Sequence, residues 1–75
     1  MGENIQTIDI DVRLDNVNIR DRVEWDVGDP SNDPHLYAAQ MCQELGLNDE
    51  FKVQIAFEIW EQVYNIHRSI HNWQT

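Results

Sequence analysis

Residues 8–27 read IDIDVRLDNVNIRDRVEWDV, and this stretch decides the fold. Apolar and polar residues alternate on both sides of the Asp15-Asn16 pair, which is the period of strands with one buried face. Asp and Asn both tolerate the positive φ angles that a tight hairpin turn needs. The stretch therefore predicts a β-hairpin over about residues 7–27.

One position of the second strand breaks this alternation. Asp21 occupies a slot where the pattern requires an apolar residue, and a buried carboxylate without a partner would be costly. The pattern therefore predicts that Asp21 marks a bend or bulge, or that its carboxylate accepts backbone N–H bonds.

A first helix is expected over about residues 34–45. Asp33 is a favourable N-cap, and Pro34 suits the first helical position because the missing N–H would have no partner there. Gly46 follows the last apolar residue and suits the left-handed conformation that ends many helices.

A second, longer helix is expected over about residues 49–72, with Asn48 as its cap and no internal Gly or Pro. Its apolar positions cover roughly 240° of the circumference, whereas a single core-facing stripe needs little more than about 100°. Either a partner binds the spare surface, which we favour, or the hairpin and the first helix clamp opposite sides of the long helix.

These patterns predict an α+β fold, a small ββαα module in which a β-hairpin packs with two C-terminal helices. Residues 1–75 are expected to form one domain. Trp25 is interpreted as a core anchor rather than a partner contact. The expected core is Ile10, Val12, Ile19, Val23, Trp25, Cys42, Phe51, Ile55 and Ile59. The expected partner-binding residues are Met41, Leu45, Phe57, Trp60, Tyr64 and Trp73.

Composition narrows the class of partner. The formal net charge is −9, from 14 acidic and five basic residues. Such a field repels phosphate backbones and anionic membrane surfaces and attracts basic proteins. Cys42 is the single cysteine, so no internal disulfide can form, and a reducing compartment fits best.

No pattern in the sequence indicates an enzyme, a metal site or a cofactor. His67 and His71 lie one helical turn apart, but a zinc site needs three or four ligands, and nothing in the spacing brings Cys42 or His35 to them. The many aspartates do not form a calcium-binding loop. A nucleophilic cysteine would need a nearby base and electropositive surroundings, which this acidic chain does not offer.

Three segments together resemble the repeat of the SNF-five (integrase interactor) family of SWI/SNF chromatin remodellers. They are a Trp-Asp block, a Cys-X-Glu-Leu-Gly-Leu block at the end of the first helix, and the start of the last helix. These blocks are Ile19–Asp26, Ala39–Leu47, and Glu50–Phe51 with Ile55–Ile59. The resemblance extends from Ile10 to about Ser69, is closer to the second of the family's two tandem repeats, and departs from it at Val23, where Phe is usual.

The resemblance implies a nuclear protein-interaction module that docks onto a SWIRM-type domain of a remodeller scaffold subunit. It also implies capture by viral integrase as a further partner interaction. Its expected contribution is assembly of the complex rather than catalysis. A direct nucleosome contact is not expected, because the chain lacks the family's basic C-terminal segment. The alternative without a remodeller role is a homodimer that pairs through the second helix, so a monomer or weak dimer is expected.

Overall fold

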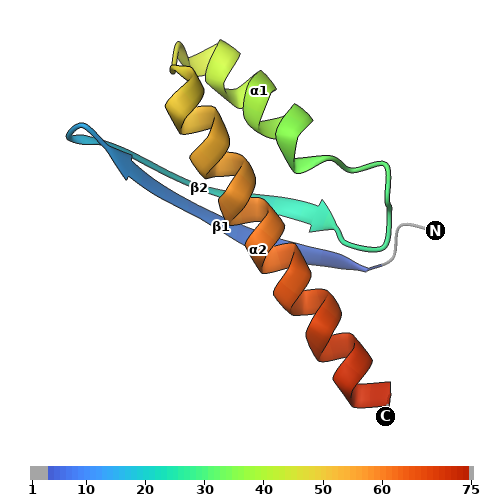
Figure 1. Ribbon diagram of the computed structural model, residues 1–75. Helices are drawn as coiled ribbons and strands as arrows, with labels where there is room; N and C mark the ends of the chain where they lie inside the picture. Colours follow the sequence, from blue (N-terminus) through green and yellow to red (C-terminus); the bar gives the residue numbers. More distant parts are fainter. Residues whose placement is uncertain (1–3, 75) are drawn as a thin grey trace.

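A computed structural model describes the backbone of residues 4–74 and the side chains of residues 4–69. Its elements, in order, are β1 (Ile5–Leu14), β2 (Val17–Asp26), α1 (Pro34–Leu45) and α2 (Asp49–Gln74). Figure 1 shows α2 crossing one face of the antiparallel hairpin, with α1 beside it. The predicted α+β class is confirmed, and the second helix ends at Gln74 rather than at about residue 72.

The hairpin is regular along its whole length. Every residue of β1 has a partner in β2, from the open end of the hairpin to the turn. Asp15 and Asn16 form the turn with φ angles of 49° and 67°. Two successive positive φ angles are what a two-residue hairpin loop needs if its twist is to match that of the strands.

Asp21 lies within this regular register, opposite Ile10. The expected bend or bulge is therefore wrong for this position. The alternative expectation is confirmed, because the Asp21 Oδ1 accepts the backbone N–H of Arg22 at 2.7 Å. The Asp21 side chain is exposed, and a carboxylate that stays in water needs no distortion of the strand.

Side chains cap the helices at the residues that the sequence indicates. The Asp33 Oδ1 accepts the N–H of His35 at 2.9 Å, and Asn48 does the same for Phe51 at 3.2 Å. Gly46 follows α1 with a φ of 71°, the left-handed conformation that glycine adopts without steric cost. The caps satisfy backbone groups that have no partner within a helix, and they set the short turn between α1 and α2.

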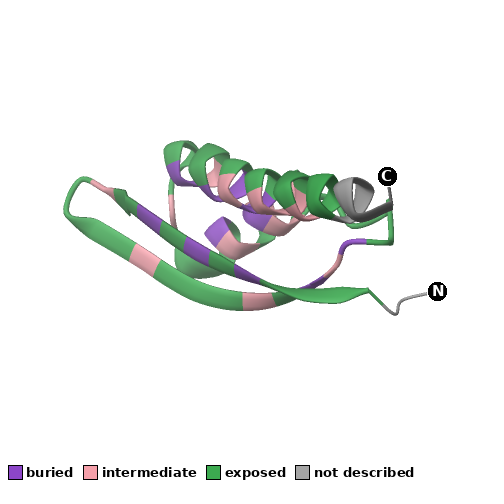
Figure 2. Ribbon diagram, turned by 90° about the horizontal axis from the view of Figure 1, so that it is seen from below, coloured by how far each residue is buried: buried purple, intermediate pink, exposed green. Residues whose placement is uncertain are grey.

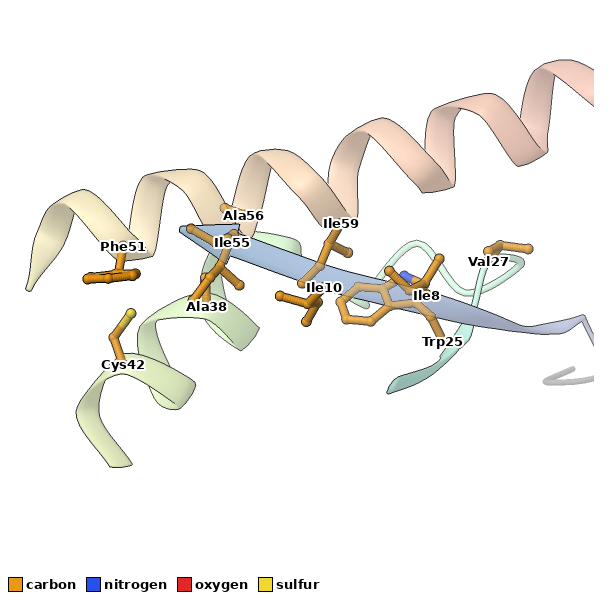
Figure 3. Close-up of a cluster of buried hydrophobic side chains, with 11 residues drawn as sticks. Ile8, Ile10, Trp25, Val27, Ala38, Cys42, Phe51, Ile55, Ala56 and Ile59 are labelled. Carbon is orange, nitrogen blue, oxygen red and sulfur yellow. The ribbon is translucent and has the colours of Figure 1, made fainter. Parts of the chain in front are cut away.

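The core is built around α2. This helix contacts both β1 and α1, whereas no Cα atom of α1 lies within 8 Å of a strand in the described part of the chain. Figure 3 shows side chains from the strands and both helices meeting along α2. The buried residues are Ile8, Ile10, Val12, Trp25, Val27, Ala38, Cys42, Phe51, Ile55, Ala56 and Ile59.

Most residues named as core by the sequence lie in this cluster, with two at its margin. Ile19 and Val23 of β2 are half-buried and pack against the cluster rather than within it. The others are Ile10, Val12, Trp25, Cys42, Phe51, Ile55 and Ile59, all buried.

Polar contacts fix α2 along the hairpin, and Figure 2 shows α2 on one side of it. The Gln62 side-chain amide accepts the N–H of Asp9 at 3.1 Å and donates to the Asp9 carbonyl. It thereby supplies, at the open edge of β1, bonds that a neighbouring strand would make. Further along, the His67 Nε2 lies 2.7 Å from the carbonyl oxygen of Val27.

Candidate functional site

Among the described side chains, large apolar residues remain exposed on all four elements, and those on α2 lie close together. Single exposed apolar residues are ordinary in proteins, but clusters of them mark contact surfaces. The exposed large apolar residues are Ile5, Val17, Leu36, Leu45, Val53, Phe57, Trp60 and Tyr64.

The first surface is a groove between α1 and β2, called the α1–β2 groove below. It combines apolar side chains with two carboxylates, those of Asp21 on β2 and Glu44 on α1. Among the described side chains, no Lys or Arg forms an ion pair with either carboxylate. The groove is lined by Asp21, Tyr37, Gln40, Met41, Glu44 and Leu45.

Tyr37 has a fixed place in this groove. Its ring packs edge-on against Trp25, with the ring centroids 5.8 Å apart and the planes at 80°, a favourable aromatic geometry. Burial raises the pKa of the Tyr37 hydroxyl, and the negative charges of Asp21 and Glu44 raise it further. The hydroxyl therefore stays protonated at neutral pH and can donate a hydrogen bond beside two carboxylates.

The acidic residues on the outer face of the hairpin have different surroundings. Asp9 forms an ion pair with Arg22 across the strands, with 3.0 Å between the Asp9 Oδ1 and the Arg22 Nε. Asp11 lies opposite Arg20 in the register. Cross-strand pairs of opposite charge stabilise a sheet. Asp9 and Asp11 are thus opposite arginines of their own chain, whereas neither groove carboxylate forms an ion pair with a described side chain.

The second surface is a row of apolar side chains on α2, called the α2 apolar row below. It consists of Val53, Phe57, Trp60 and Tyr64, each between 49% and 59% exposed. The Trp60 ring stacks on Tyr64 at 5.3 Å and on Phe57 at 6.4 Å. Together with His35 and Ala56, part of the row lines a shallow hollow beside the start of α1.

The residues predicted to bind a partner do not form one surface. Met41 and Leu45 line the α1–β2 groove, whereas the aromatic residues of the set lie in the α2 apolar row. The Trp73 side chain lies outside the described residues. Sequence reasoning did not assign Asp21 to a binding surface, although its misfit in the alternation was a usable signal.

Two of the residues weighed for catalysis or metal binding, Cys42 and His67, have structural surroundings in the described part of the chain. Cys42 is buried, and burial raises the pKa of its thiol, which makes it a poor nucleophile at neutral pH. His67 contacts the Val27 carbonyl, and the His71 side chain lies outside the described residues. Within those residues, no three His, Cys, Asp or Glu side chains are grouped to hold a metal ion, and neither helix is long and apolar enough to cross a membrane.

Comparison with known proteins matches this chain to one family model and to subunits of chromatin-remodelling complexes. The model of the SNF5 / SMARCB1 / INI1 family matches residues 5–75. The SWI/SNF chromatin-remodeling complex subunit SNF5 of Saccharomyces cerevisiae is 40% identical over 63 residues, 84% of this chain and 7% of that protein. The chromatin structure-remodeling complex protein BSH of Arabidopsis thaliana is 38% identical over 66 residues, 87% of this chain and 28% of that protein. The chain thus spans only a small part of the curated relatives it matches.

Proposed function

The chain belongs to the SNF5 / SMARCB1 / INI1 family, and on this premise we propose that it is a non-catalytic assembly module of a nuclear chromatin-remodelling complex. Its relatives in budding yeast and Arabidopsis are named as chromatin-remodelling complex proteins. The finer part of the proposal concerns the partner: the module docks onto a SWIRM-type domain of a scaffold subunit.

The observation that carries this proposal is the composition of the α1–β2 groove. Met41 and Leu45 offer apolar contact area, which supplies most of the favourable free energy in protein association. Asp21 and Glu44 stand at the same groove without an ion-pair partner among the described side chains. An apolar surface with unpaired carboxylates fits a partner surface that carries apolar side chains beside Lys or Arg.

Charge complementarity favours such a partner over a neutral one. The net charge of −9 attracts a basic surface from a distance and raises the association rate. In the complex, a Lys or Arg of the partner would pair with Asp21 or Glu44, and the Tyr37 hydroxyl would offer a hydrogen bond nearby. Because these contacts are electrostatic, binding should weaken as salt increases.

The proposal is tested by titrating the 75-residue chain with a SWIRM domain in a calorimeter. Leu45→Glu and Asp21→Asn should each weaken binding by at least about tenfold, the scale of a lost central contact or a truncated charge pair. Trp60→Glu is the matched control, because Trp60 and Leu45 are both 54% exposed but lie on different surfaces. The control should bind like the wild type.

Circular dichroism of each variant first establishes that it is folded. The proposal fails if the wild-type chain gives no heat and no chemical-shift change with a SWIRM domain at high micromolar concentration. It also fails if Trp60→Glu abolishes binding while Leu45→Glu leaves it intact, because the docking surface would then not be the groove.

A further inference from the structure

The α2 apolar row has a spacing that the docking proposal does not explain. Val53, Phe57, Trp60 and Tyr64 follow one another at intervals of four, three and four residues. That is the repeat of a helix seam that packs against a second helix. The next position in the repeat is His67, whose Nε2 lies 2.7 Å from the carbonyl oxygen of Val27.

The aromatic side chains of the row are held in a stacked arrangement before any partner binds. Trp60 and Tyr64 stack with 9° between their ring planes, and Phe57 and Trp60 with 25°. Side chains that are ordered before association lose less conformational entropy when they bind. The closed stack leaves no slot between Trp60 and Tyr64 for a proline ring, so a helix fits this surface better than an extended proline-rich segment.

From this geometry we infer that the α2 apolar row pairs with the same row of a second copy of this chain, as an antiparallel helix pair. A pairing centred between Phe57 and Trp60 sets each Phe57 against the second copy's Trp60 and each Val53 against the second copy's Tyr64. Seam geometry then places Gln54 beside the second copy's Glu61. The row itself contains no charged residue, so the pairing buries no unpaired charge.

The distribution of charge favours a second copy at this surface rather than at the groove. Nine of the acidic residues lie in residues 1–33, which contain the hairpin, and five lie in residues 34–75. In Figure 2, α2 lies on one side of the hairpin. Pairing through the outer face of α2 therefore keeps the two acidic hairpins at opposite ends of the dimer, whereas pairing through the groove would bring Asp21 and Glu44 of both copies together.

The area indicates a weak dimer. Four half-exposed side chains of this size offer on the order of 400 Å² per chain. Two chains together then bury less than the about 1,200–2,000 Å² of a standard stable interface. Repulsion between two chains of charge −9 weakens the pair further. Salt screens that repulsion, so self-association should strengthen with salt, while docking of a basic partner in the groove should weaken.

Sedimentation equilibrium of the 75-residue chain tests this inference. The measurement covers about 10 µM to about 1 mM protein, the range of weak association, at about 50 mM and about 500 mM salt. The wild type should form a reversible dimer whose association constant is higher in the high-salt buffer. Trp60→Glu and Tyr64→Glu should each lower that constant by about tenfold or more, whereas Leu45→Glu should leave it within about twofold.

Two results would overturn the inference. One is a wild-type chain that stays monomeric at the highest concentration in high salt. The other is a dimer that survives both substitutions in the row, with circular dichroism showing both variants to be folded. Neither result bears on docking in the groove, which depends on Leu45 and Asp21 and has the opposite salt dependence.

Discussion

The two strands of the hairpin have the same alternation of side chains but different surroundings. Ile8 and Ile10 of β1 lie beneath α2 and are 0% and 1% exposed. On the matching face of β2, Ile19 and Val23 are only half-buried, and Asp21 between them is exposed. The difference arises because α2 packs on β1, while α1 keeps its backbone more than 8 Å from β2 in Cα separation.

This comparison shows that an alternating pattern predicts which side chains share a face but not whether anything covers that face. Two strands are too narrow for two helices, since strands lie about 4.8 Å apart and packed helices about 8–10 Å apart. The helix that covers β1 therefore leaves its neighbour beyond the edge of the sheet. The α1–β2 groove lies in the space that remains, so the proposed docking surface is the part of β2 that the core does not use.

Removal of the Trp25 side chain should have the largest effect on stability, because Trp25 is the point where β2 does enter the core. It is 7% exposed and packs against Tyr37. Trp25→Ala should cost about 3–5 kcal/mol, a large part of the stability that a small domain has. Thermal unfolding followed by circular dichroism measures the loss, and a near-normal melting temperature would show that the end of β2 is not part of the core.

A matched pair of substitutions compares the middle of the two strands directly. Ile10→Ala in β1 should cost about 2–5 kcal/mol, because it leaves a cavity beneath α2. Ile19→Ala in β2 should cost about 1 kcal/mol, because that side chain is half-buried at the margin of the core. Urea unfolding of both variants provides the comparison, and equal losses would mean that β2 is covered as well as β1.

A substitution at Asp21 makes the face of β2 that carries Ile19 and Val23 apolar throughout its middle. Asp21→Val should leave the free energy of unfolding within about 0.5 kcal/mol of the wild type, since Asp21 is exposed. It should weaken docking of the SWIRM domain by at least about tenfold. Asp11→Asn is the control, because Asp11 is also an exposed carboxylate but lies on the other face, opposite Arg20. Equal effects of the two substitutions on binding would count against the groove.

The smallest predicted effect concerns Glu58, where α2 passes β1. Burial raises the pKa of the Glu58 carboxyl above its usual value of 4.5, and the charges of Glu61 and Asp11 raise it further. Folding therefore disfavours the ionised form, and stability falls as pH rises from below 4.5 through the raised pKa. Glu58→Gln removes this loss, so it should raise the melting temperature slightly at pH 7.

The same substitution should have no effect at about pH 3, where the wild-type carboxyl is protonated in both the folded and unfolded states. Calorimetric melting of both proteins across this pH range provides the check. A stabilisation of equal size at pH 3 and pH 7 would show that the effect is not electrostatic.

Local chemistry made much of the fold predictable. Asp15 and Asn16 adopt the positive φ angles that their side chains tolerate. Asp33 and Asn48 cap the helices that follow them. Each of these features depends on residues close together in the chain, which is why the pattern of a single sequence is enough to identify them.

The candidate surfaces were less predictable, because they depend on how distant segments meet. The excess of apolar residues on the second helix indicated that some of its apolar surface would be exposed. It did not indicate that Leu45 and Trp60 would lie on different surfaces. Periodicity places residues around one helix and does not orient that helix against a strand. A carboxylate such as Asp21 then has the same sequence signal whether it marks a bulge or stands exposed in a regular strand.

The sequence by itself determined the order of the elements, most of their ends, the face of each strand that is apolar, and the strongly negative charge. These follow from side-chain chemistry and from spacing along the chain. Only the tertiary structure decided that α2 lies on β1 and not on β2. The same is true of two features of the described side chains: Asp21 and Glu44 come to one groove without an ion-pair partner, and Val53, Phe57, Trp60 and Tyr64 of α2 remain exposed. The reason is geometric, because two helices are wider than two strands, and packing alone selects which strand is left partly open.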